Sequence, residues 1–241
     1  MSIPGSSDAD AIRPPASEGG VPLAILGGTF DPVHYGHLRL ADDVRTALAL
    51  PEVRLVPAAN PPHREPPRAS ARDRVAMLRL AVHEFPGLVV DTREIARGGK
   101  SYTVDTLTEL RAEMPHRPLA LLVGADAFRG LASWHRWRTL FELAHLIVVP
   151  RPGVTIGAGL ADPLAREWAT RRIGDPRGLR TRASGAIFVQ SVTAQPISAT
   201  GIRAALARGD AGSVEMAGLV PVAVLAYIES NRLYSSLPHA S

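Results

Sequence analysis

The sequence has no cysteine, and this absence excludes disulfide bonds, thiolate metal sites and a cysteine nucleophile. A chain without disulfides fits the reducing cytoplasm, which is the location we expect. Long hydrophobic runs are absent as well. The apolar stretches are short, as in 146–149, whereas a transmembrane helix needs about 20 apolar residues. We therefore expect no membrane span.

Lysine and aromatic residues are scarce. Lys100 is the sole lysine, so the formal net charge of +4 rests on arginine, and aromatic residues make up 5% of the chain. Arginine binds phosphate oxygens well, which suits a protein that handles nucleotides, although an arginine-rich, lysine-poor composition also reflects codon usage. No dense basic run carries interleaved aromatic residues, so no nucleic-acid partner is predicted.

Hydrophobic residues form 46% of the 241 positions, which is enough for one substantial core. We expect a single compact domain over 21–234. Residues 1–20 mix Ser, Gly, Pro and Asp without the basic start and apolar stretch of a secretory signal, which predicts a disordered tail. Residues 235–241 form the C-terminal tail. A homo-oligomer is compatible with the sequence, which does not determine the number of subunits.

Short apolar runs alternate with helical patterns along the chain. We expect strands over 21–26, 53–56, 88–90, 119–123, 146–149 and 187–189. We expect helices over 36–50, from Ser70 onward, and over 103–114, 134–144, 200–208 and 222–231, with one helical piece at 163–172 in an otherwise loop-like 152–185. The alternation predicts an α/β, Rossmann-like, doubly wound parallel sheet with helices on both faces.

The most informative segment is 27–37, which reads Gly-Gly-Thr-Phe-Asp-Pro-Val-His-Tyr-Gly-His between the first expected strand and helix. Ligands bind at this side of a doubly wound sheet. Glycines let the main chain approach a phosphate, and a helix N-terminus offers unpaired amides. His34 and His37 are three residues apart, so a first helical turn would direct both toward one polyphosphate. For an isolated pair, a helix cap and a polar filler would be the better interpretation.

In its full context, this segment is similar to the opening signature of the HxGH nucleotidyltransferase superfamily, and its longer form resembles the bacterial nicotinate mononucleotide adenylyltransferases. Near the C-terminus, 197–203 reads Ile-Ser-Ala-Thr-Gly-Ile-Arg and resembles that family's Ile-Ser-Ser-Thr-x-Ile-Arg signature. Ala199 replaces one serine and removes one hydroxyl. Alone, this segment would be interpreted as an ordinary helix cap followed by an exposed arginine.

The resemblance implies an enzyme that transfers AMP from ATP to nicotinate mononucleotide, giving deamido-NAD and pyrophosphate in NAD biosynthesis. The attacking phosphate is already ionised near neutral pH, so catalysis needs positioning and charge stabilisation and no general base. We assign His37 to the α-phosphate, His34 to the adjacent phosphates and Arg203 to the leaving pyrophosphate. Mg²⁺ is expected to arrive with ATP, because the sequence offers no carboxylate cluster for a metal site of the protein's own.

The resemblance assigns ATP binding to residues of the two motifs and of the turn after the fourth expected strand: Gly28, Thr29, Phe30, His34, His37, Gly124, Asp126, Ile197, Ser198, Thr200 and Arg203. It assigns the nicotinate nucleotide to three middle segments: Asn60, His63, Arg64, Tyr102, Thr103 and Trp134. Each segment also has a plainer interpretation, as a solvated polar loop, a helix cap or a core tryptophan.

Two other functions are compatible with parts of this pattern. A sister enzyme, such as phosphopantetheine adenylyltransferase or a cytidylyltransferase, would share the phosphate motifs without the middle segments. A non-catalytic ATP-sensing module would keep the fold and bind ATP without turnover, although the intact histidines and Arg203 argue against it. The preference for nicotinate over nicotinamide rests on the resemblance.

Overall fold

The computed structural model describes residues 20–62, 65–150, 156–193 and 197–235. Most of both expected tails therefore lies outside the described residues, and so do His63 and Arg64. In the described part of the chain, no helix combines the length and the apolar character that are needed to cross a membrane.

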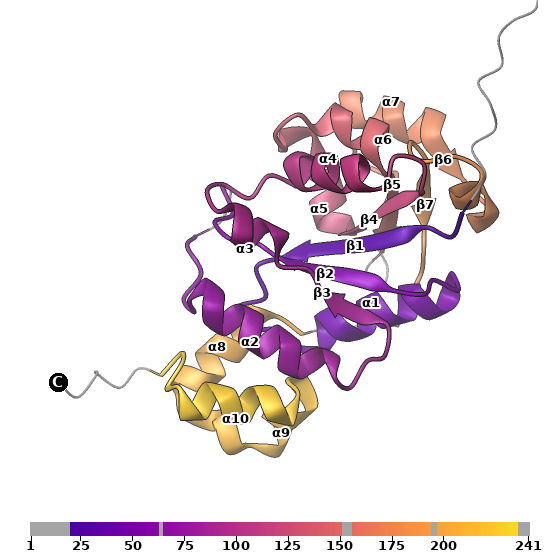
Figure 1. The fold of residues 1–241 in the computed structure, drawn as a ribbon. Coiled ribbons are helices and arrows are strands. Elements are labelled where there is room, and N and C mark those ends of the chain that lie inside the picture. The colour runs from indigo at the N-terminus through magenta and orange to yellow at the C-terminus, as the bar shows by residue number, and fades with distance from the viewer. Residues whose placement is uncertain (1–19, 63–64, 151–155, 194–196, 236–241) are drawn as a thin grey trace, which may run out of the picture.

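A seven-stranded parallel sheet organises the fold, in the order β3-β2-β1-β4-β5-β7-β6 (Figure 1). The strands are β1 Leu23–Gly28, β2 Val53–Pro57, β3 Leu88–Val90, β4 Leu119–Gly124, β5 His145–Val149, β6 Arg172–Ile173 and β7 Ile187–Val189. This arrangement confirms the predicted α/β doubly wound sheet. The strand order changes direction between β1 and β4, and ligands of such sheets bind beyond the carboxyl ends of the strands at that point.

Helices cover both faces of the sheet. They are α1 Tyr35–Ala47, α2 Ala71–Val82, α3 Arg93–Arg97, α4 Thr103–Glu113, α5 Ala125–Arg129, α6 Leu140–Leu143, α7 Asp162–Arg171, α8 Ala199–Ala207, α9 Val214–Leu219 and α10 Val222–Ser230. Short 3₁₀ helices cover Leu131–Ser133, Trp137–Thr139, Pro176–Arg180 and Asp210–Gly212.

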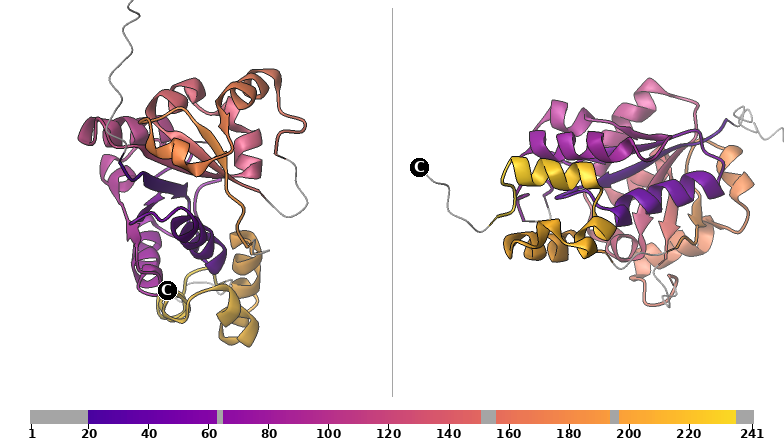
Figure 2. Two further views of the ribbon diagram at one scale, coloured as in Figure 1. Left: turned by 90° about the vertical axis from the view of Figure 1, so that its right-hand side faces the viewer. Right: turned by 90° about the horizontal axis from the view of Figure 1, so that it is seen from below.

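The core consists of two apolar layers, one on each face of the sheet. Because successive strand residues point to opposite faces, Ala24 packs with α1, α2 and α8–α10, while its neighbours Leu23 and Ile25 pack with α4–α7. Figures 1 and 2 show the three C-terminal helices gathered beside α1 and α2 on one side of the sheet. This packing brings the segment just after α10 close to the segments that follow β1, as the contact of Tyr234 with Asp31 shows.

The expected helix over 134–144 is wrong. Arg136 adopts a left-handed backbone conformation with φ 50° and ψ 40°, and Trp134 is extended, so the segment breaks into a 3₁₀ turn and the four-residue α6. The patterns also missed α3, α5, α9 and the two-residue strand β6, since such short elements carry too little periodicity to detect. The other expected strands and helices are present with shifts at their ends. For instance, β1 extends through Gly28.

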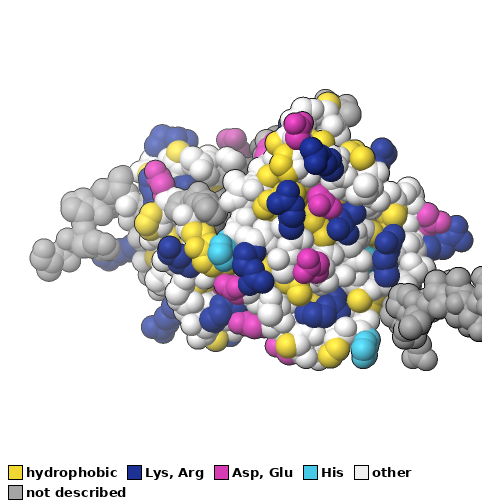
Figure 3. Space-filling model, turned by 90° about the horizontal axis from the view of Figure 1, so that it is seen from above, with side chains coloured by type: hydrophobic (Ala, Val, Ile, Leu, Met, Phe, Trp, Pro, Cys, Tyr) yellow, Lys and Arg dark blue, Asp and Glu magenta, His cyan; other side chains and the backbone are white. Residues whose placement is uncertain are grey.

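Basic and acidic side chains are interspersed on the face drawn in Figure 3, without a continuous stripe of one charge. The expectation that nucleic acid is not a partner stays a prediction.

Candidate functional site

The turn between β1 and α1 is shaped by Gly28 and a buried ring. Phe30 has φ 50°, and its side chain is 1% exposed. A Cβ atom on Gly28 would lie 2.9 Å from the Phe30 ring, so glycine is what allows the ring to fold back over the end of β1. The chain then enters α1 at His34, which is the N-cap residue in an extended conformation.

His34 and His37 lie together at the N-terminus of α1, as their spacing predicts. Their rings stack with centroids 3.7 Å apart and an interplanar angle of 27°. Phe30 packs edge-on against His37 at 5.0 Å. A Cβ atom on Gly36 would come within 2.9 Å of Nδ1 of His34, which explains why glycine stands between the two histidines. The pair therefore forms a compact aromatic unit beside the amides of the helix end.

Burial controls the charge of His34. Its side chain is 4% exposed, and desolvation lowers its pKa from 6.5 to about 4. Nδ1 of His34 is buried against Gly36 and has no hydrogen-bond partner among the described residues. At neutral pH His34 is therefore an uncharged imidazole.

The second motif packs directly on the first. Cβ of Ile197 lies 3.4 Å from the place that a Cβ atom on Gly36 would occupy. Ser198 caps α8 by accepting a hydrogen bond from the Gly201 amide at 3.1 Å. Arg203 donates to the main-chain oxygen of Asp31 at 2.6 Å and to Oγ1 of Thr200 at 3.2 Å. The fold thus brings 27–37 and 197–203 into contact, although they are far apart in the sequence.

Three residues that the sequence analysis did not assign make contacts with the turn between β1 and α1 or with each other: Asp31, Arg74 and Tyr234. The side chain of Arg74 is 1% exposed and donates to the main-chain oxygens of Thr29 at 2.8 Å and Ala59 at 3.4 Å. Desolvation lowers the pKa of Arg74. The sequence carried one signal for it, because Arg74 occupies an inward position of α2.

Beside this region lies a cavity of about 240 Å³. Three residues predicted to bind the nicotinate nucleotide, Tyr102, Thr103 and Trp134, line it together with Gly28 and Thr29. The other lining residues come from β1 and β4, from the short helices α3 and α5 and from the loops around them: Gly27, Ala58, Pro61, Pro62, Glu94, Ser101, Leu121, Leu122, Ala127 and His135. The cavity therefore shares the β1 turn with the two motifs.

The loops around the cavity are fastened to each other. The Ser101 hydroxyl accepts hydrogen bonds from the amides of Ala59 at 2.8 Å and Asn60 at 3.3 Å, and the Ser101 amide donates to the Asn60 oxygen at 2.9 Å. Asn60 is exposed beside the lining residues Pro61 and Pro62.

The Tyr102 ring lies 4.4 Å from the ring of His135, and Trp134 is half-buried. These three rings belong to two loops that meet across the cavity. Sequence reasoning missed His135, although it follows the assigned Trp134 directly.

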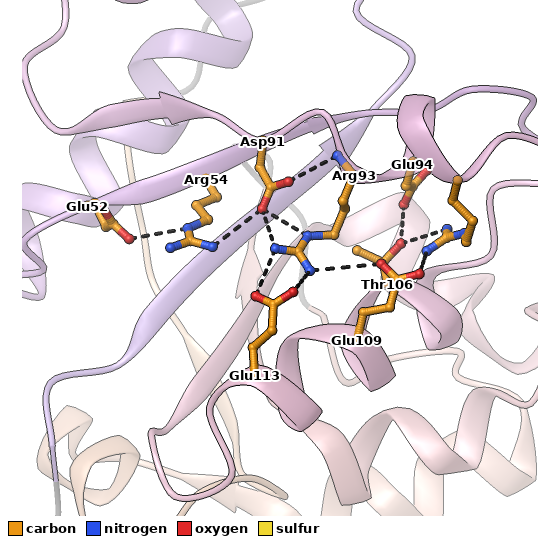
Figure 4. A network of polar contacts seen from close by, with 9 residues as sticks. Glu52, Arg54, Asp91, Arg93, Glu94, Thr106, Glu109 and Glu113 are labelled. Carbon is orange, nitrogen blue, oxygen red and sulfur yellow. Dashed lines mark hydrogen bonds and ion pairs between the residues drawn. The ribbon is translucent and has the colours of Figure 1, made fainter.

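Glu94 is a buried carboxylate in the cavity wall that the sequence patterns also missed. It is 7% exposed and accepts a hydrogen bond from Thr106 at 2.6 Å. Arg97 donates to Thr106 at 3.1 Å and to Glu109 at 2.7 Å. In Figure 4 this chain of contacts continues through Arg93 toward the strands, so Glu94 is held by a network of charged groups.

Gly124 and Asp126 lie at the carboxyl end of β4, next to β1 in the sheet. Both are exposed and are not among the residues that line the cavity. The described residues contain no group of three or more His, Asp or Glu side chains that could hold a metal ion.

Comparisons with known proteins agree with this architecture. The family model described as cytidylyltransferase-like matches residues 25–205. A Halorhodospira halophila protein named "Probable nicotinate-nucleotide adenylyltransferase" is 52% identical over 187 residues, covering 78% of this chain and 85% of that protein. A protein of the same name from Laribacter hongkongensis is 50% identical over 217 residues, covering 90% of this chain and 96% of that protein.

A solved structure, Plasmodium falciparum nicotinic acid mononucleotide adenylyltransferase complexed with NaAD, has a TM-score of 0.67 to this chain at 14% identity. The likeness covers 89% of this chain and 98% of the other. At this identity, it shows that the two chains share a fold.

Proposed function

The chain belongs to the cytidylyltransferase-like family and, within it, to the nicotinate-nucleotide adenylyltransferases, and on this premise we propose that it joins ATP and nicotinate mononucleotide. A phosphate oxygen of the mononucleotide attacks the α-phosphorus of ATP. The bond from that phosphorus to the bridging oxygen breaks, and pyrophosphate leaves as deamido-NAD forms. The observation that carries the proposal is the stacked histidine pair and Arg203 at one turn, next to the cavity.

We propose that His37 stabilises the charge that develops on the α-phosphate and that His34 contacts the adjacent phosphates. With a pKa of about 4, His34 meets the triphosphate as a neutral hydrogen-bond donor. Its Nδ1 faces Gly36, so Nε2 is the ring nitrogen placed to face a ligand. Preorganised donors of this kind lower the barrier because they need no reorganisation during the reaction.

Ser198, Thr200 and Arg203 are proposed to receive the leaving pyrophosphate at the N-terminus of α8, where main-chain amides and a guanidinium favour anions. The remaining ATP contacts are proposed for the two turns at the carboxyl ends of β1 and β4 and for the start of the second motif: Gly28, Thr29, Phe30, Gly124, Asp126 and Ile197.

The nicotinate nucleotide is proposed to occupy the cavity. Trp134 stacks on the pyridine ring, and the main chain at Tyr102 and Thr103, where α4 begins, meets the carboxylate. Asn60 is proposed to contact the mononucleotide phosphate together with His63 and Arg64. Support comes from the position of the cavity. Gly28 and Thr29 belong both to its wall and to the turn between β1 and α1, which we call the phosphate turn.

Mg²⁺ is proposed to arrive bound to the phosphates of ATP and to neutralise part of their charge. The proposal follows the chemistry of the ion, since Mg²⁺ commonly binds substrate phosphates and water. Cytoplasmic location and homo-oligomerisation stay predictions.

The test is to incubate the protein with MgATP and, separately, nicotinate mononucleotide, nicotinamide mononucleotide and phosphopantetheine, and to identify products by mass. We expect deamido-NAD and pyrophosphate with nicotinate mononucleotide. A product with phosphopantetheine alone would favour the sister enzyme. ATP binding by calorimetry without pyrophosphate from any acceptor would favour the ATP-sensing module.

A further inference from the structure

Asp31 lies at the centre of the contacts beneath the phosphate turn. The residue is 5% exposed, and its carboxylate accepts three hydrogen bonds. Two come from the amides of Arg68 at 2.8 Å and Ala69 at 3.1 Å, and the third comes from the Tyr234 hydroxyl at 2.6 Å. Its main-chain oxygen accepts from Arg203 at 2.6 Å. One residue thus connects the second motif, the loop before α2 and the C-terminal segment to the β1 turn.

The C-terminal segment turns back to make this contact. After α10 ends, Arg232 and Tyr234 both adopt left-handed backbone conformations, with φ of 52° and 63°. That conformation is unfavourable for residues with side chains and persists where tertiary contacts hold it. The Tyr234 ring packs against the core beside α10. Burial and the neighbouring Asp31 carboxylate raise the pKa of Tyr234, so its hydroxyl remains a donor throughout the neutral range.

The geometry points to Tyr234 as a positioning residue for Arg203, an inference that rests on the proposed function. The three donors satisfy the Asp31 carboxylate, so the Arg203 guanidinium stays 4.0 Å from its Oδ2 atom and is held by the main-chain oxygen. A guanidinium bound to a neutral carbonyl keeps its charge available for phosphate oxygens. If the hydroxyl were lost, Asp31 would compete for Arg203 as a direct ion pair.

The test compares two tyrosines of the same C-terminal region. Tyr234→Phe removes the hydroxyl and keeps the ring. Tyr227→Phe is the matched control, because the Tyr227 hydroxyl also bonds an aspartate, Asp73 at 2.9 Å, which belongs to α2 and does not contact Arg203. We expect Tyr234→Phe to lower kcat on the order of 10-fold, with a change in KM for ATP below about 3-fold. We expect Tyr227→Phe to leave kcat within about 2-fold of the wild type.

A double-mutant cycle separates positioning from general destabilisation. Adding Tyr234→Phe to Arg203→Ala should change kcat by less than about 2-fold, because Tyr234 acts through the side chain that is already removed. Equal kcat losses in the two Tyr→Phe variants, no loss in Tyr234→Phe, or multiplied losses in the double variant would each overturn the proposal.

Hydrogen exchange gives a readout that does not depend on turnover. Tyr234→Phe, but not Tyr227→Phe, should speed amide exchange in peptides that cover 29–37, and unchanged exchange in both would overturn the proposal. If the wild-type protein makes no dinucleotide, the proposed function fails, and the exchange comparison still decides the role of Tyr234.

Discussion

The phosphate region around the β1 turn and the cavity beside it meet at Gly28 and Thr29, yet they are built differently. The phosphate region consists of the two motifs 27–37 and 197–203. They are joined by polar contacts such as the hydrogen bond that Arg203 donates to the main-chain oxygen of Asp31. The cavity is enclosed by loops from several parts of the chain, fastened by contacts such as that of Ser101 with Ala59. Binding residues that lie in contiguous motifs can be recognised in a sequence. Residues of a cavity that is formed by separate loops can be identified only from the folded structure.

One side chain contacts both regions. Arg74 donates to Thr29 in the phosphate turn and to Ala59 in the cavity wall. We expect substitutions in the phosphate region to change mainly the kinetics with ATP, and substitutions in the cavity to change mainly KM for nicotinate mononucleotide. A substitution at Arg74 should change both KM values.

The largest expected effect is that of His37→Ala in the phosphate region. Loss of one donor to the developing charge should lower kcat by roughly 10²- to 10³-fold with a smaller change in KM. Steady-state pyrophosphate release measures both constants. The exposed His83 provides a control, because His83→Ala removes an imidazole far from the turn. Wild-type kcat in a folded His37→Ala protein would refute the assignment.

Acid should weaken the fold through the buried histidines. Desolvation lowers the pKa of His34 and of His145 to about 4, against 6.5 without burial. Between these values the unfolded chain binds more protons than the folded one, so stability falls as pH falls from 6.5 to 4. The loss is at most about 3 kcal/mol for each histidine. Above pH 6.5 these two histidines make no contribution to the dependence of unfolding free energy on pH.

Urea unfolding at pH 7, 5.5 and 4 measures this dependence. His34→Ala should reduce the loss, while His83→Ala should keep it in full. An equal loss in wild type and His34→Ala would mean that His34 is accessible to protons in the folded state, contrary to its burial.

Arg74→Met should weaken both regions. The substitution leaves the carbonyl oxygens of Thr29 and Ala59 without their donor, which should cost about 2 kcal/mol of unfolding free energy. The KM values for ATP and for nicotinate mononucleotide should rise together. Urea unfolding and steady-state kinetics measure the two effects, and a rise in one KM alone would show that Arg74 does not join the regions.

The smallest expected effect belongs to the cavity. Trp134→Ala should raise KM for nicotinate mononucleotide about 10-fold through loss of a stacking ring, with KM for ATP unchanged. Trp134→Phe keeps an aromatic face and should recover part of the loss. If KM for ATP rose as much, Trp134 would belong to the phosphate region instead.

Most of the sheet could be predicted because its central strands are buried on both faces, which makes each a continuous apolar run between segments of helical periodicity. The capped start of α2 could be predicted as well, since Ser70 accepts a hydrogen bond from the Asp73 amide. The segment after β4 could not, because the left-handed Arg136 that ends the expected helix leaves no mark in the hydrophobic pattern.

The sequence by itself determined the order of the longer strands and helices and the proximity of His34 to His37, since local spacing fixes both. Only the tertiary structure decided that Tyr234 meets Asp31, that Arg203 binds the same residue's carbonyl, and that Glu94 faces the cavity. These contacts join positions far apart in the chain, and their partners follow from how the layers pack on the sheet, which no local pattern records.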